Sequence, residues 1–126
     1  MAYLRERREG EAVRDAEGGV ITDDEVEKAL CYLRDNAVKA AQARAAKAYM
    51  EEYRKVVKAQ IMREAMSDSL GSQESRAYSD DRYVQHLKAM REAIEKDEYH
   101  RWMMVAAEAK IEAWRTQCSN QRAMKI

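Results

Sequence analysis

Residues 22–66 read TDDEVEKALCYLRDNAVKAAQARAAKAYMEEYRKVVKAQIMREAM, and neither proline nor glycine interrupts this stretch. Alanine, glutamate, lysine, arginine and methionine dominate it, and all of these residues favour helices. Thr22 stands three positions before Glu25, which is the spacing of a capping box at the start of a helix. Asp23 adds negative charge where the helix dipole favours it. The stretch therefore predicts one long helix that begins at Asp23.

Two apolar stripes follow this predicted helix. Helical spacing places the first stripe on Val26, Leu30, Leu33, Ala37 and Ala41. The second stripe consists of Tyr49, Tyr53 and Val56 and lies on nearly the opposite side. A straight helix cannot present both stripes to one partner. Either the helix breaks near Asp35-Asn36, or its two halves pack on different neighbours.

The remainder of the chain predicts a loop and a second helix. Residues 67–78 are small and polar and include Gly71, so we expect a loop of about ten residues there. Ser79, followed by two aspartates, marks a new helix start that leads through Trp114 to about residue 122. Its apolar face consists of Tyr83, Leu87, Met90, Ile94 and Val105.

The run W-M-M-V-A-A over residues 102–107 is apolar on all sides, which predicts a fully buried turn. No sustained heptad pattern is evident. The predicted fold is all-α: two long helices forming a helical hairpin.

Length and composition predict one domain that assembles with copies of itself. The chain has 126 residues, which suits a single domain over residues 21–126 preceded by a flexible charged arm at 1–20. Charged residues make up 37% of the chain and phenylalanine is missing, so a monomer buries little core. A homo-oligomer supplies the missing burial.

The sequence also predicts a cytoplasmic protein. No stretch approaches the roughly 18 apolar residues of a membrane span, so no membrane partner is expected. The charged beginning of the chain is followed by no apolar run, which argues against a signal peptide. Cys31 and Cys118 lie far apart and are interpreted as two helix-packed thiols in a reducing compartment.

Residues suited to catalysis are few, and we predict no enzyme, no cofactor and no metal. His86 and His100 are fourteen positions apart, too far for a helical metal pair at i and i+4. The carboxylates near Asp97 are interpreted as a solvated helix face rather than a catalytic cluster. The sequence contains no glycine-rich phosphate loop and no zinc-ligand spacing.

Charge is segregated along the chain although the formal net charge is zero. Residues 36–65 hold seven basic and three acidic side chains, and residues 110–126 hold four and one. Residues 1–30 and residues 67–109 each carry more acidic than basic side chains. A basic helical surface can bind phosphates with release of counterions. The alternative interpretation is a solvated basic face balanced by nearby glutamates.

Two groups of residues are candidates for binding nucleic acid. Within about 100° of arc on the first helix lie Arg44, Lys47, Arg54, Lys55 and Lys58, with Arg63 one turn beyond. The second group, near the end of the second helix, consists of Lys110, Arg115 and Arg122, with Lys125 and Trp114 beside them. An exposed indole stacks on bases at about 1–3 kcal/mol per base, although packing is the commoner role of a helical tryptophan.

A third group is predicted to form oligomer or partner contacts because its members are apolar or aromatic and helically spaced. These residues are Leu30, Leu33, Tyr49, Tyr53, Leu87, Met90, Ile94, Trp102, Val105 and Trp114.

The order of features over residues 30–125 resembles the UvsY-type recombination mediators of phages. The short pieces that carry the resemblance are Val57-Lys58-Ala59-Gln60-Ile61, Ser79-Asp80-Asp81-Arg82-Tyr83 and Ser119-Asn120-Gln121-Arg122-Ala123. The family's Lys-Ala-Arg piece falls on Lys58, Ala59 and Gln60, so glutamine replaces its arginine here. Arg63 offers a charge one turn on.

The resemblance implies a helical homo-oligomer that binds single-stranded DNA and, if the chain comes from a phage, lies in the cytoplasm of the bacterial host. It further implies a mediator that helps a strand-exchange recombinase replace a single-strand-binding protein. Two other functions remain open from the residues alone. One is a scaffolding or assembly protein that needs no DNA, and the other is a small regulator that binds a protein through residues 102–107 or the arm.

Overall fold

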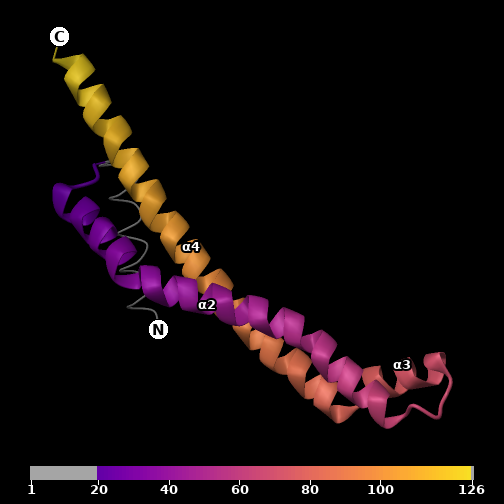
Figure 1. Ribbon diagram of the computed structural model, residues 1–126. Helices are drawn as coiled ribbons and strands as arrows, with labels where there is room; N and C mark the ends of the chain where they lie inside the picture. Colours follow the sequence, from indigo (N-terminus) through magenta and orange to yellow (C-terminus); the bar gives the residue numbers. More distant parts are fainter. Residues whose placement is uncertain (1–19, 126) are drawn as a thin grey trace, which may run out of the picture. The chain divides into compact units, whose positions relative to one another are not determined.

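The computed structural model describes residues 20–125, and this part of the chain forms three α-helices without a strand (Figure 1). They are α2 (Asp23–Glu64), α3 (Leu70–Ser79) and α4 (Asp81–Met124). The prediction of an all-helical chain is therefore confirmed. The predicted arm at residues 1–20 lies outside the described residues, apart from Val20.

Helix α2 begins where the capping pattern predicts. The amide of Glu25 donates to the Thr22 hydroxyl at 3.2 Å, so the side chain of Thr22 caps the first turn. Helical hydrogen bonding continues through Asp35 and Asn36, so α2 does not end there. Of the two alternatives left open for this helix, a break near Asn36 is therefore wrong.

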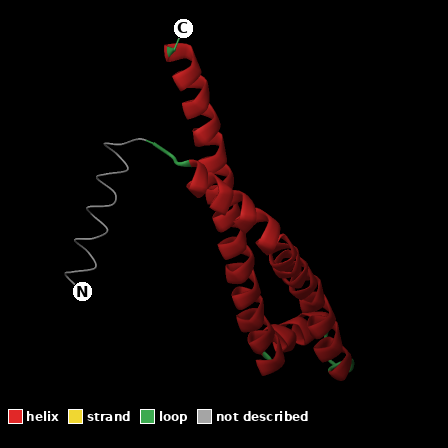
Figure 2. Cartoon of the chain, turned by 90° about the vertical axis from the view of Figure 1, so that its left-hand side faces the viewer, coloured by secondary structure: helices red, strands yellow, loops and turns green. Residues whose placement is uncertain are grey.

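The predicted loop at residues 67–78 is wrong, because most of it is helix α3 (Figure 2). Ser69 caps α3 by accepting a hydrogen bond from the amide of Ser72 at 3.3 Å. Ala77 of α3 is fully buried against Ile61 of α2 and Tyr83 of α4. Burial of this apolar cluster outweighs the modest helix propensity of the serines and Gly71.

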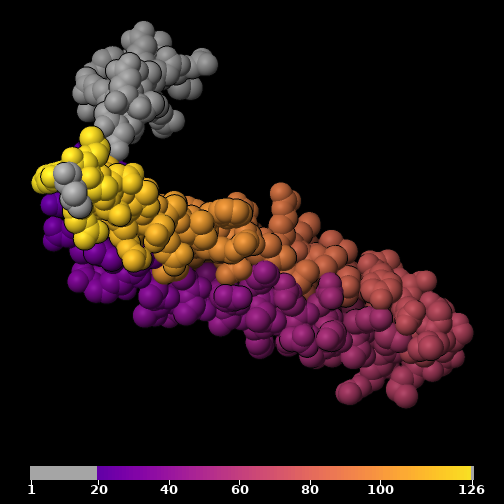
Figure 3. Space-filling view, turned by 90° about the horizontal axis from the view of Figure 1, so that it is seen from above, coloured from indigo at the N-terminus to yellow at the C-terminus, as the bar shows by residue number. Residues whose placement is uncertain are grey.

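Contacts along the chain define two compact units. Among the described residues, the terminal unit comprises 20–34 and 104–125, and the central unit comprises 35–103. Helices α2 and α4 both run from one unit into the other. In the central unit, α2 and α4 lie side by side (Figure 3), and their contacts run antiparallel, since Met50 meets His86 while the earlier Lys47 meets Asp97.

Buried or half-buried residues of the central unit recur mostly every three or four positions, the spacing of a coiled coil. In α2 they include Asn36, Ala40, Ala43, Lys47, Met50, Val57 and Ile61, with one interval of seven between Met50 and Val57 because Arg54 is exposed. In α4 they are Tyr83, His86, Met90, Ala93, Asp97 and His100. A sustained heptad spacing is therefore present, contrary to our expectation. Short and polar side chains occupy so many of these positions that an apolar pattern does not reveal it.

The terminal unit continues the same spacing on both helices. The buried or half-buried positions that follow this spacing are Val26, Ala29, Leu33, Met104, Ala107, Ile111, Trp114 and Cys118. Gln117 exchanges two hydrogen bonds of 2.8 Å with the backbone of Ile21. The Trp114 indole donates to Asp23 at 3.2 Å. Polar contacts thus hold the start of α2 to α4 in this unit.

Several predicted apolar faces are corrected by this arrangement. Leu30, Ala37 and Ala41 are exposed, because the contact positions lie at Ala29, Asn36 and Ala40 instead. On α4, Leu87 and Val105 are likewise exposed.

The run at residues 102–107 is not a buried turn in the single chain. Trp102 is 59% exposed, and Met103 and Val105 are also exposed. Only Met104 and Ala107 of this run occupy contact positions, since an α-helix turns just part of its circumference toward one neighbour.

Candidate nucleic-acid and self-association surfaces

Lys47 is not part of an exposed basic stripe. It occupies a contact position between α2 and α4, and its ammonium group lies 3.6 Å from the Asp97 carboxylate. The Lys47 side chain is 30% exposed and that of Asp97 is 12% exposed. The side of α2 that was predicted to be an exposed basic stripe overlaps the side that contacts α4. Lys47 therefore lies at the contact and not on the free surface. Asp97 is correspondingly no solvated carboxylate but an interior partner.

Lys58 is also engaged within the chain. Its ammonium group donates to the Tyr78 hydroxyl at 2.8 Å, lies 4.8 Å from the centre of that ring, and lies 3.8 Å from Glu74. The hydrogen bond to Tyr78 raises the pKa of Lys58, as does the charge of Glu74. This lysine joins α2 to α3 and offers little charge to an outside ligand.

The other cations predicted on α2 remain available at the surface. Arg44, Arg54, Lys55 and Arg63 are all exposed. Lys55 pairs with Glu52 one turn away at 3.3 Å, an interaction that solvent weakens. Arg44 and Lys55 project within about 20° of one another around the helix axis and about 16 Å apart along it. These two form the cationic face of α2.

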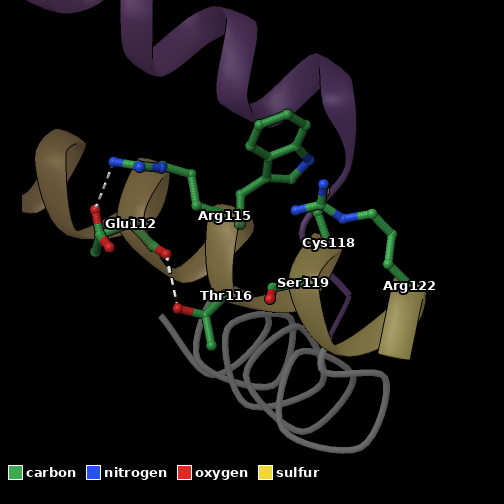
Figure 4. A pocket seen from close by; sticks show the side chains of 7 residues that line it. Glu112, Arg115, Thr116, Cys118, Ser119 and Arg122 are labelled. Carbon is green, nitrogen blue, oxygen red and sulfur yellow. Dashed lines mark hydrogen bonds and ion pairs between the residues drawn. The ribbon is translucent and has the colours of Figure 1, made fainter. Parts of the chain in front are cut away.

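Of the predicted C-terminal group on α4, Trp114, Arg115 and Arg122 line a hollow in the terminal unit (Figure 4). Arg115 reaches back to Glu112 at 3.4 Å, and Arg122 lines the same hollow. Lys110 and Arg122 are exposed. Trp114 is half-buried and bonded to Asp23, so its indole packs within the chain rather than standing free for a base.

The residues predicted to contact other copies divide into two sets. Leu33, Tyr53, Met90, Ile94 and Trp114 are half-buried within the chain. Exposed, and so accessible to another molecule, are Leu30, Tyr49, Leu87, Trp102 and Val105. Tyr49 stacks on Tyr53 at 5.6 Å between ring centres, and Tyr53 in turn contacts His86.

An outer row on α4 was not anticipated from the sequence. Tyr99 and Trp102 in the central unit and Ala106, Ala109 and Ala113 in the terminal unit are exposed positions of α4 at intervals of three and four. Within each unit they lie on the side of α4 opposite the contact positions of that unit. Alanine counts as apolar in such a row, and this signal was available in the sequence. A second helix could pack against such a row.

Groups that perform chemistry do not gather in the described chain. Among residues 20–125, no cluster of three or more histidine, cysteine, aspartate or glutamate side chains is placed to hold a metal ion. Cys31 and Cys118 are free, half-buried thiols. His86 is buried and its Nε2 lies 2.7 Å from the Met50 carbonyl, which is a structural contact.

No known protein family, curated protein or solved structure matches this chain. The described helices contain no segment long and apolar enough to cross a membrane.

Proposed function

We propose that this protein acts by assembly rather than by catalysis. Copies of the helical hairpin associate through the outer row of α4, and the assembled particle binds single-stranded DNA on its repeated cationic faces. The exposure of the outer row supports this proposal most directly: Trp102 and Tyr99 are each 59% exposed on a helix whose opposite side already packs on α2.

A repeated surface matters because one chain offers little charge. The structure withdraws Lys47 and Lys58 from the predicted footprint and leaves Arg44 and Lys55 on the cationic face of α2. Several copies held together multiply weak contacts into firm binding. This is the behaviour that the resemblance to UvsY-type mediators implies, with loading of a recombinase in place of a single-strand-binding protein as the cellular role.

Assembly is tested by the substitution Trp102→Glu. Multi-angle light scattering of the parent protein should give the mass of a defined oligomer, and the variant should give that of a smaller species. Val38→Glu is the matched control, since Val38 is a 66% exposed apolar residue of α2 outside the outer row. Equal masses for all three proteins would refute the assignment of the outer row.

DNA binding is tested by fluorescence anisotropy of a labelled single-stranded oligonucleotide. Affinity should fall steeply as salt rises, because phosphate contacts release counterions. Arg44→Glu/Lys55→Glu should weaken binding and flatten its salt dependence. Lys88→Glu/Arg91→Glu, which changes charge equally on α4, should leave binding near the parental value.

The scaffolding function is the second candidate, and the same exposed row favours it. A protein that forms the oligomer but binds no oligonucleotide at low salt would be assigned to scaffolding or to regulation of another protein.

A further inference from the structure

A groove in the central unit has no part in the surfaces described so far. It lies between α2 and α4 and has a volume of about 490 Å³. Its lining consists of Lys39, Gln42, Ala43, Ala46, Ala93, Lys96 and His100. Three alanines leave this space open, because their short side chains do not fill the distance between the two helices.

The groove is positively charged and contains no acidic lining residue among those described. Neither Lys39 nor Lys96 has an ion-pair partner within residues 20–125, whereas Lys47 and Lys58 both do. Asp97, which follows Lys96 directly in the sequence, is paired with Lys47. Two lysines of different helices thus share one hollow without a counter-charge from the described chain.

His100 supplies an independent observation. It is 8% exposed, and its Nδ1 is buried without a hydrogen-bond partner in the described part of the chain. Buried polar atoms almost always have a partner. His86, the other histidine, satisfies this rule through the Met50 carbonyl. The ring of His100 lines the groove, so a ligand seated there contacts this ring. Nδ1 itself is buried, and a ligand reaches it only when the neighbouring side chains shift.

We propose that this groove binds a phosphate group. A phosphate monoester holds between −1.5 and −2 charges near neutral pH and presents three strong acceptor oxygens. Lys39 and Lys96 balance that charge from opposite helices, and the imidazole of His100 and the amide of Gln42 can donate hydrogen bonds. The proposal goes beyond the proposed function, since it requires neither assembly nor extended DNA.

The two histidines allow a direct test by proton NMR. Inorganic phosphate is titrated into the full-length protein at constant pH and constant ionic strength, with sodium chloride as the balancing salt. The ring proton of His100, assigned by its loss in His100→Gln, should shift and saturate in the millimolar range. The ring proton of His86 should stay in place. A non-saturating drift of both signals would overturn the proposal.

Lysine variants then test the assignment of the site. Lys39→Ala/Lys96→Ala should lower the affinity for phosphate, measured by the His100 shift, at least tenfold. Circular dichroism should show an unchanged helix content. Lys88→Ala/Arg91→Ala removes two cations of α4 outside the groove and should retain the parental affinity. Equal affinity in both double variants would refute the groove as the binding site.

Oligonucleotides with and without a 5′-phosphate distinguish the source of the ligand. Tighter binding of the phosphorylated strand, lost in Lys39→Ala/Lys96→Ala, identifies a DNA terminus as the ligand. Equal binding of both strands together with a saturable phosphate shift at His100 identifies a free phosphorylated small molecule. Failure of every phosphate probe would overturn the groove proposal, while the light-scattering result on the outer row would stand unaffected.

Discussion

Lys47 and Asp97 illustrate at the residue scale how charged side chains can specify packing. Both occupy contact positions that a coiled coil normally fills with apolar residues. Their ion pair sits between α2 and α4 of the central unit, where it favours the register that brings opposite charges together. Removal of one partner leaves the other charge poorly solvated and lowers stability, whereas replacement of both by apolar residues can leave stability unchanged.

We expect Asp97→Ala to lower the free energy of unfolding by about 1–2 kcal/mol, a value reduced because Lys47 retains access to water. Lys47→Met/Asp97→Leu should recover most of this loss. Urea unfolding followed by circular dichroism measures both. Glu95→Ala, on the exposed side of α4, should change the free energy by less than about 0.5 kcal/mol. A double variant less stable than the single one would contradict this account.

Arg82 gives a residue-scale prediction for pH. It donates to Glu64 at 2.9 and 2.6 Å and to Asp80 at 3.0 Å. These hydrogen bonds lower the pKa of Glu64 and of Asp80 below their usual values of 4.5 and 3.8. A lowered pKa stabilises the fold above the unfolded-state pKa, and that stabilisation is lost as the pH falls through the folded-state value.

The urea midpoint of the parent should therefore exceed that of Arg82→Gln at pH 6, and the gap should narrow as the pH falls below the usual carboxyl pKa values of 4.5 and 3.8. Arg91→Gln, which removes an exposed arginine of the same helix, should show a gap that does not change with pH. A gap for Arg82→Gln that does not narrow as the pH falls would show that Arg82 acts through packing alone.

Helix α3 shows at the element scale what local sequence signals omit. Ser, Gly and Gln are typical of a loop and recur over residues 67–78, yet Ala77 of this segment is fully buried against Ile61 and Tyr83. A single alanine contact between distant segments leaves no periodic trace in the sequence. The Ser69 cap was the local signal that could have indicated the helix start.

Ile61→Ala should reveal how strongly this cluster holds α2, α3 and α4 together. Ile61 is 1% exposed, so its truncation removes buried methyl groups and leaves a cavity. We expect the free energy of unfolding to fall by about 2–4 kcal/mol, with faster hydrogen exchange across α3. Val56→Ala, a truncation at an exposed position of α2, is the control and should cost under 1 kcal/mol. Similar losses of unfolding free energy for both variants would contradict the stabilising role of the cluster.

The long helices themselves were predictable because nothing in residues 23–64 or 81–124 breaks a helix. Their contact face was not, because the heptad positions include Asn36, Lys47, His86, Asp97 and His100. The exposed cations Arg44 and Lys55 follow from sequence, but the engagement of Lys58 by Tyr78 depends on where α3 lies. Such long-range pairings are fixed by tertiary structure, which the sequence pattern alone does not reveal.

At the scale of the whole molecule, the described chain buries few large apolar side chains. Ile61 is the largest side chain that is fully buried in residues 20–125, and alanines form much of the remaining core. Leu30, Tyr49, Tyr99 and Trp102 stay exposed. A small core and an exposed apolar row together favour stabilisation through association.

This balance predicts that stability depends on protein concentration. If copies associate only when folded, the melting temperature should rise as concentration increases, because mass action favours the folded oligomer. Calorimetry from about 5 to 500 µM should show this rise for the parent and for Val38→Glu. Trp102→Glu should melt at one temperature throughout, since it removes the largest side chain of the outer row. A concentration-dependent melt retained by Trp102→Glu would move the association surface away from α4, toward the exposed Leu30 and Tyr49 of α2.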